Sequence, residues 1–203
     1  STLFPYTTLF RSRTGARHHA GLLTRRRLAV RWLQDRPRIG ADPDVCVLAP
    51  SPPERTRLRS VRTWQPGHAP PMLAIEVVSN ANPKKDYSTA PEKFAANGTG
   101  ELWVFDPERL GRSHGGPFLL QRWSREPDGV FVRCYAGDGP MYSSAVDAWA
   151  IAEPDGALRI AAAASGSGRW LTAEEAAIAE RDAVSAERAG SRSEERRVGK
   201  ECR

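Results

Sequence analysis

Cysteine is scarce in this chain and occurs only at Cys46, Cys134 and Cys202. No two cysteines form a CxxC pair, which argues against a zinc site, and nothing indicates a disulfide framework. Cys46 and Cys134 lie in apolar runs, so we expect both to be buried free thiols. No apolar run approaches the roughly 20 residues of a membrane span, and no signal peptide is visible. We therefore expect a cytoplasmic protein that has no membrane contact.

The two ends of the chain are related as complementary DNA. Thr2–Ser12 reads TLFPYTTLFRS and Arg192–Cys202 reads RSEERRVGKEC. When one stretch is read backwards, its codons can complement those of the other at every position, as Pro5 (CCC) does with Gly199 (GGG). The sequence also resembles a common sequencing adapter. We interpret residues 1–12 and 192–203 as assembly artefacts, with a truncated native chain between them, and exclude both from fold reasoning. The alternative is a genuine terminal repeat.

Removing these ends changes the charge of the chain. They hold six basic and three acidic residues, so the formal charge of +6 falls to +3. The remainder is therefore only weakly basic, and its length suits one domain with a real core.

Strand and helix signals indicate an α/β protein. Residues 89–97 predict a short helix, because Pro91 suits its first turn and Gly98 its end. The two flanking apolar runs then form a βαβ-like unit. We also expect a helix stump near Leu22, a long loop over residues 50–71 and a helix from a Thr172–Glu175 capping box to about residue 188. The strands are expected in four pairs: 27–33 with 44–49, 72–78 with 101–106, 118–123 with 130–135, and 149–151 with 158–161.

Two acidic residues stand out in the strand-like runs. Asp44 opens DVCVLA, and Glu76 lies in the middle of MLAIEVV. A carboxylate inside such a run is costly to bury unless it is paired or binds a cation. Together the two acids predict an oxygen-rich site for magnesium, with Lys84, Lys85 or Lys93 adding positive charge. The alternative is that Asp44 merely starts a strand and Glu76 pairs with a basic neighbour.

The proline-rich segment over residues 50–71 is basic. It carries four arginines, and they offer contacts to nucleic-acid phosphates. The alternative is a solvated loop. The arginines are Arg55, Arg57, Arg59 and Arg62.

The combined motifs resemble those of the Uma family of bacterial restriction endonucleases, in the PD-(D/E)xK nuclease superfamily. They are PDV at residues 43–45, IEVVS at 75–79, Asp86 in the following turn and GTGELWVFDP at 98–107. The resemblance implies a restriction-endonuclease-like mixed central sheet with flanking helices, to which we add β-hairpins and a C-terminal helix. It implies Mg²⁺- or Mn²⁺-dependent hydrolysis of DNA phosphodiester bonds, with Asp44 and Glu76 as catalytic metal ligands, and action as a homodimer.

The lysine departs from the family pattern. In the superfamily a lysine often stands two residues after the glutamate, where this chain has Val78. Family members usually carry it four residues after the aspartate, where this chain has Ala90. We predict that Lys93, one turn further along the helix, replaces it as a catalytic residue, with Lys85 and Asp86 as accessory groups.

Two functions remain open at this stage. The first is a metal-dependent DNA endonuclease, and the second is a weakly active or inactive nucleic-acid-binding module with the nuclease fold. We expect a nuclease-like domain over residues 13–165, followed by a loop and truncated helix over 166–191.

Overall fold

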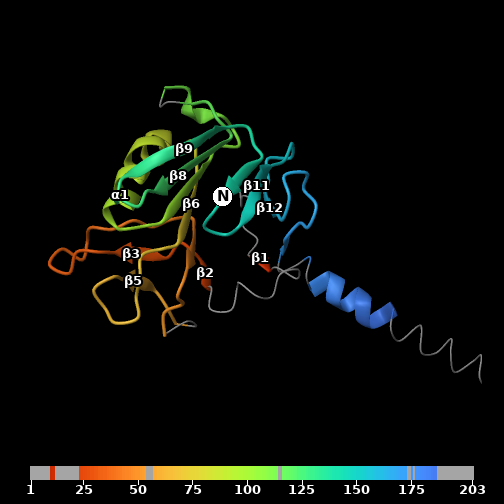
Figure 1. Cartoon of the computed structure of the whole chain (residues 1–203), viewed down its shortest axis with the longest axis horizontal. Coiled ribbons are helices and arrows are strands. Elements are labelled where there is room, and N and C mark those ends of the chain that lie inside the picture. Colours follow the sequence, from red (N-terminus) through yellow and green to blue (C-terminus); the bar gives the residue numbers. More distant parts are fainter. Residues whose placement is uncertain are drawn as a thin grey trace, which may run out of the picture.

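A six-stranded sheet forms the centre of the protein (Figure 1). The computed structural model describes residues 10–11, 23–53, 57–113, 116–172, 175 and 177–186. In spatial order the strands are β2 (Leu23–Arg26), β4 (Val45–Leu48), β6 (Leu73–Val77), β7 (Glu101–Phe105), β8 (Leu120–Arg125) and β9 (Phe131–Gly137). β6 and β7 are parallel, and the other neighbouring pairs are antiparallel. The predicted mixed central sheet is therefore confirmed.

The predicted strand–helix–strand unit is present between β6 and β7. The helix α1 (Ala90–Ala96) has Pro91 in its first turn, and Gly98 follows its end with a φ of 85°. Both residues suit those places, since proline tolerates the first helical turn and glycine tolerates positive φ. The helical run begins earlier than predicted, with a π-helical turn η1 (Lys85–Thr89) directly before α1.

The strands before β6 pair differently from the prediction. β3 (Ala29–Arg31) pairs in parallel with β5 (Ser60–Arg62), which lies inside the segment predicted as a loop. The predicted hairpin of residues 27–33 and 44–49 is therefore wrong, because β4 pairs with β2 and β6. A strand also replaces the expected helix stump at Leu23. Periodicity identifies a strand but leaves its partner undetermined, because pairing depends on contacts distant in sequence.

Both predicted hairpins after β7 are confirmed. β8 and β9 are joined across Asp128-Gly129, and β11 (Ala148–Ala152) pairs with β12 (Leu158–Ala161). The prediction of a buried Cys134 is wrong. A bulge at Arg122/Trp123 leaves Cys134 without a partner residue on the edge strand β9, where it is exposed, whereas Cys46 is buried.

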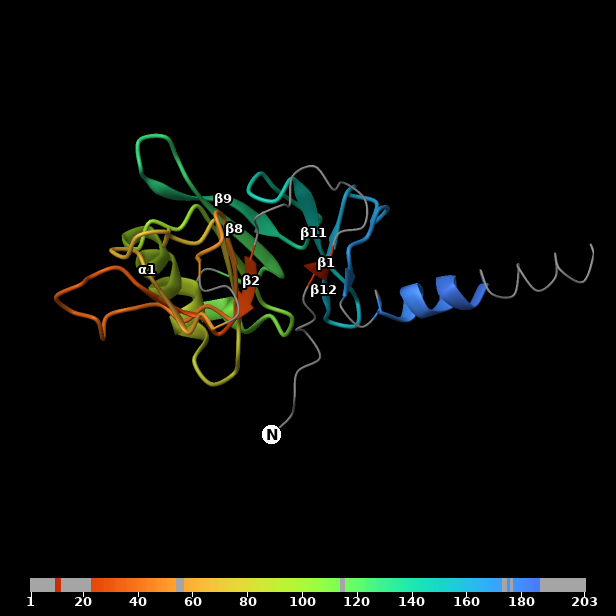
Figure 2. The same cartoon turned by 90° about the horizontal axis from the view of Figure 1, so that it is seen from below.

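Two apolar cores cover the faces of the main sheet. Successive strand residues point to opposite faces, so Trp103 and Phe105 join one core while Leu102 and Val104 join the other. The first core includes the small sheet of β10 (Met141–Ser143), β11 and β12, and the second includes Phe94 of α1. Figures 1 and 2 show α1 and the small sheet on opposite sides of β8.

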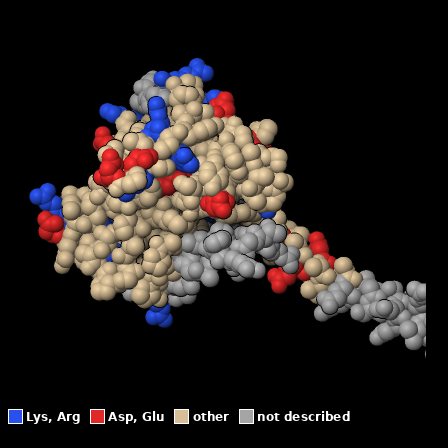
Figure 3. Space-filling model, in the orientation of Figure 1, with Lys and Arg blue, Asp and Glu red and all other residues tan. Residues whose placement is uncertain are grey.

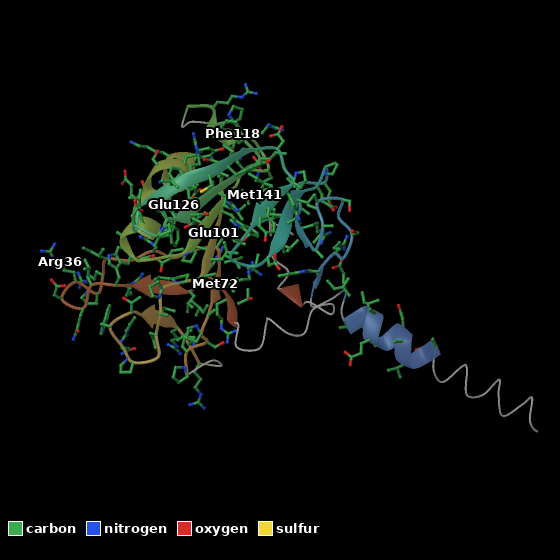
Figure 4. All side chains as sticks on the ribbon, viewed as in Figure 1. Arg36, Met72, Glu101, Phe118, Glu126 and Met141 are labelled. Carbon is green, nitrogen blue, oxygen red and sulfur yellow. The ribbon has the colours of Figure 1, made fainter. Side chains whose placement is uncertain are left out.

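A buried glutamate joins the small sheet to the main sheet. Glu101 Oε1 accepts hydrogen bonds from Trp103 Nε1 at 2.6 Å and from Ser143 Oγ at 2.5 Å. Figure 4 shows Glu101 and Met141 in the middle of the molecule, where β7 and β10 approach each other. Glu101 therefore accepts hydrogen bonds from neutral groups that join the two sheets, and it is not part of the cluster of Asp44, Glu76 and Asp86.

Two residues of the terminal segments 1–12 and 192–203 are described, and both lie in a strand. Phe10–Arg11 form β1, which pairs with β13 (Leu171–Thr172); the rest of 1–12 and all of 192–203 lie outside the described residues. Residues 177–186 are helical and extend away from the sheets (Figure 1). Thr172 lies in β13 and Glu175 contacts Arg159 and Arg169, whereas residues 173–174, on which the predicted capping box depends, lie outside the described residues. Within the described ranges, no helix has the length and apolar character needed to cross a membrane.

A short 3-10 helix completes the elements. This helix, η2 (Leu110–Ser113), follows β7 and carries Gly111 beside the ring of Tyr87. It therefore links the end of β7 to the turn η1.

Candidate active site

Asp44 and Glu76 lie on neighbouring strands at one end of the central sheet. β4 and β6 are antiparallel with Val45 opposite Ile75, so one further step of this register places Asp44 opposite Glu76. Directly opposite residues point to the same face. The Asp44 carboxylate is fixed there, because Oδ2 accepts a hydrogen bond from the backbone N–H of Val77 at 2.8 Å.

Glu76 is a buried carboxyl group. Only 2% of the residue is exposed, and the sheet surrounds it with apolar neighbours such as Ala74 and Val78. The pKa of Glu76 is raised to about 8, chiefly by burial; the ammonium of Lys85 opposes this rise, and the carboxylates of Asp44 and Asp86 contribute to it. At neutral pH the group therefore holds its proton unless another positive charge replaces that proton.

Lys85 bridges two buried acids. Its Nζ lies 3.5 Å from Glu76 Oε2 and 3.3 Å from Asp86 Oδ1. Partial burial lowers the pKa of Lys85, but Glu76 and Asp86 outweigh this effect and raise it above its ordinary value. Burial likewise raises the pKa of Asp86, and Lys85 opposes that rise. Asp86 Oδ1 is buried, and its closest charged partner among the described residues is the Lys85 ammonium.

The charges of this cluster fit a divalent cation. Three carboxylates, those of Asp44, Glu76 and Asp86, face the single ammonium of Lys85. If all three ionise, two negative charges remain, which is the charge that Mg²⁺ or Mn²⁺ carries. Among the described residues no group of three or more His, Cys, Asp or Glu side chains is arranged to hold an ion unaided. Backbone oxygens and water would therefore have to complete the shell around Asp44 and Glu76.

Lys93 does not join these acids. It is exposed on α1, whereas its neighbour Phe94 is fully buried in the core. No ion pair joins Lys93 to an acid of the described chain, and the lysine in contact with Glu76 is Lys85. Ala90, where family members usually carry a lysine, is 2% exposed and packs in the core. Lys85, which the sequence suggested as an accessory group, is therefore the lysine that contacts Glu76.

The π-helical turn explains this difference. Lys85 opens the π-helical turn, and Lys93 follows it by eight residues. At 1.5 Å per residue, that separation is about 12 Å along the axis. The sequence-based choice of Lys93 assumed that the helix begins near residue 89. The signal that could have found Lys85 is its place beside Asp86.

The four arginines of the basic segment lie apart from the acids in sequence. Arg57, Arg59 and Arg62 are exposed, and Arg55 lies outside the described residues. On the face drawn in Figure 3, Lys and Arg are interspersed with Asp and Glu. Arg36 lies at the tip of a projecting loop in Figure 4. The basic side chains are therefore spread over several elements.

Comparison with known proteins identifies a related family. The family model Uma2, putative restriction endonuclease, matches residues 7–111, a range that contains Asp44, Glu76 and Lys85 and overlaps the adapter-like segment. One solved structure, a putative nuclease belonging to DUF820 from Anabaena variabilis ATCC 29413, has 14% sequence identity and a TM-score of 0.39. The match covers 61% of this chain and 60% of that chain. No curated protein matched the chain.

Proposed function

Because the chain belongs to the Uma2 family of putative restriction endonucleases, we propose that it is a magnesium-dependent endonuclease that hydrolyses DNA phosphodiester bonds. The observation that carries this proposal is the buried Glu76, which lies opposite Asp44 and in contact with Lys85. A buried carboxyl group with a strongly raised pKa beside a specific charged partner is typical of functional sites.

Asp44 and Glu76 would hold the divalent ion, Mg²⁺ or Mn²⁺. When bound, such an ion lowers the pKa of a water molecule and polarises a phosphoryl oxygen. Val77 keeps the Asp44 carboxylate at the edge of the site through its backbone N–H. Glu76 must lose its proton to act as a ligand, since metal-binding carboxylates are ionised.

Lys85 would stabilise charge that develops on the phosphate. The Lys85 side chain is 47% exposed, so its ammonium group can reach a substrate while it remains near Glu76. Asp86 Oδ1 lies 3.3 Å from this ammonium and would help to hold it in place. Hydrolysis adds water across one P–O bond and leaves a phosphate and a hydroxyl group. A preorganised positive charge at the phosphate is the kind of group that speeds such a step.

The exposed arginines Arg57, Arg59 and Arg62 are proposed contacts for DNA phosphates outside the reacting centre. Such contacts add affinity without sequence information. The homodimer implied by the family resemblance likewise remains a proposal.

Nicking of supercoiled plasmid in Mg²⁺ or Mn²⁺ tests the proposed function. We expect cleavage by the parent chain and none by Glu76→Ala. Lys85→Ala should lose about a hundredfold or more, the usual scale for one preorganised charge at a developing anion. Lys93→Ala and Glu92→Gln, both on the exposed side of α1, are the controls and should match the parent.

The second candidate function is a nucleic-acid-binding module that does not cut. The observation that favours it is Ala90, a buried alanine where relatives usually carry the catalytic lysine. If the parent binds DNA but never cuts it with either ion, this second function replaces the first. If Lys93→Ala is inactive while Lys85→Ala cuts normally, our choice of lysine is wrong.

A further inference from the structure

Tyr87 is the third residue of the turn η1, which also carries Lys85 and Asp86. The residue is 6% exposed, and its hydroxyl donates a hydrogen bond to Asp106 Oδ2 at 2.7 Å. A second acceptor near this hydroxyl is the carbonyl oxygen of Phe118 at 3.4 Å, whose residue is labelled in Figure 4. Tyr87 therefore ties η1 to the segment that follows β7 and to the segment that leads into β8.

Asp106 is a rigid acceptor for this bond. It is 0% exposed, and its carboxylate also accepts the backbone N–H groups of Leu110 at 3.0 Å and Gly111 at 2.9 Å. Three donors thus converge on one buried carboxylate. The Tyr87–Asp106 contact therefore ties two buried groups together.

Two glycines leave room for the Tyr87 ring. A Cβ added at Gly111 would lie 2.0 Å from the ring carbon Cζ, and one added at Gly116 would lie 2.9 Å from the hydroxyl oxygen. Real side chains essentially never approach so closely. Any residue larger than glycine at 111 would therefore displace the ring and the turn that carries it.

The turn η1 is an uncommon structure, and contacts with the rest of the fold stabilise it. In η1 the N–H of Ala90 reaches back to the carbonyl of Lys85, and π-helical turns of this kind are rare and frequent at functional sites. Its first two residues, Lys85 and Asp86, form the ion pair beside Glu76, and the third is Tyr87.

We propose that Tyr87 is a positioning residue, which holds η1 through Asp106 so that the Lys85 ammonium stays against Glu76. The consequence for cleavage rests on the proposed function, but the position of Lys85 does not. The simpler alternative is that Tyr87 only fills the core. The two accounts differ, because a core residue affects the whole domain, whereas a positioning residue affects one turn.

Amine labelling of the full-length chain without metal separates the two accounts. The Lys85 ammonium lies against two buried acids, and the exposed Lys93 eight residues away is an internal reference. Tyr87→Phe keeps the ring in its slot and removes only the hydroxyl. We expect it to raise labelling of Lys85 severalfold relative to Lys93. Tyr142→Phe is the matched control, since its hydroxyl bonds Asp147 at 2.7 Å on the remote small sheet, and it should leave the ratio unchanged.

Amide hydrogen exchange of the same variants gives a second readout. Loss of this buried hydrogen bond should speed exchange at residues 86–90 by about tenfold. Exchange in β7 should stay as in the parent. An unchanged labelling ratio, or equal acceleration in η1 and β7, would overturn the proposal.

These readouts remain informative whatever happens to cleavage. If the parent does not cut DNA but Tyr87→Phe releases Lys85, the proposed function fails and the positioning role stands. If the parent cuts and Tyr87→Phe leaves both the labelling ratio and the cleavage rate unchanged, the positioning role fails alone.

Discussion

At the scale of single residues, Glu76 is a buried acid with a strongly raised pKa. It is 2% exposed, and burial raises its pKa from the ordinary value of 4.5 to about 8. The neighbouring Asp44 and Asp86 add to this rise, and Lys85 only partly offsets it. Glu76 is therefore protonated in the metal-free protein at neutral pH. Binding of a cation would favour release of that proton.

This shifted pKa predicts how stability depends on pH. The unfolded chain releases the Glu76 proton near 4.5 and the folded chain near 8, so the folded state binds more protons between these values. The contribution of Glu76 to stability therefore falls as pH rises through this window. Glu76→Gln has no carboxyl proton to lose. Its free energy of unfolding should therefore increase relative to that of the parent between about pH 5 and pH 9.

Urea unfolding without divalent ions at several pH values measures this difference. Glu92→Gln, an exposed glutamate on α1, is the control and should follow the parent at every pH. Parallel curves for Glu76→Gln and the parent would mean that Glu76 titrates normally.

The two acids of the site could be predicted from sequence, but the lysine could not. Asp44 and Glu76 are conspicuous because each is a carboxylate in an apolar run. The choice between Lys85 and Lys93 depends on where the helical run begins. A π-helical turn has no clear sequence signal, so spacing along an ideal α-helix favoured Lys93, whereas the lysine in contact with Glu76 is Lys85.

At the scale of elements, Arg125 secures the end of α1. Its guanidinium donates to the carbonyl oxygens of Ala95 at 2.6 Å, Phe94 at 3.3 Å and Thr99 at 3.1 Å. The last carbonyl groups of a helix have no partner within the helix, and a cation suits that end. Arg125 on β8 therefore joins the helix to the sheet.

Replacing this arginine should loosen α1. Arg125→Met is expected to lower the free energy of unfolding by about 2 kcal/mol, the scale of hydrogen bonds that involve a charged group. Arg125→Lys should recover little, because an ammonium cannot reproduce the guanidinium fork. Arg133→Met on the neighbouring strand is the control, since Arg133 is exposed and donates one bond, to Gln121 at 3.3 Å. Equal losses for both arginines would show that Arg125 has no special role.

Sequence patterns predicted the elements better than their partners. The β6–α1–β7 unit and the β8–β9 hairpin follow from signals within about 30 residues of chain, such as Pro91 and Asp128-Gly129. The pairing of β3 with β5 joins segments separated by a long proline-rich stretch, and no local signal specifies it. The exposure of Cys134 depends on a bulge, which shifts side chains between faces in a way that periodicity does not register.

At the scale of the whole molecule, the ends of the chain contribute little to the described fold. Of residues 1–12, the structure describes only Phe10 and Arg11, which pair with Leu171–Thr172. We predict that deleting residues 1–12 and 192–203 together shifts the melting temperature by less than about 4 °C, equivalent to about 1 kcal/mol in a domain of this size. Calorimetry of the two chains checks this. A loss of several kcal/mol, comparable to a core truncation, would show that the ends belong to the fold.

The central claim concerns one ion between two strands. Asp44 and Glu76 face each other across β4 and β6, and the net negative charge of the ionised cluster suits a divalent cation. Calorimetric titration with Mn²⁺ near pH 8 tests this most directly, because it requires neither DNA nor turnover. We predict one binding site in the parent chain and in Glu92→Gln, and no binding in Glu76→Gln or Asp44→Asn. A parent chain that binds no ion, or a Glu76→Gln variant that binds as tightly as the parent, would contradict the account.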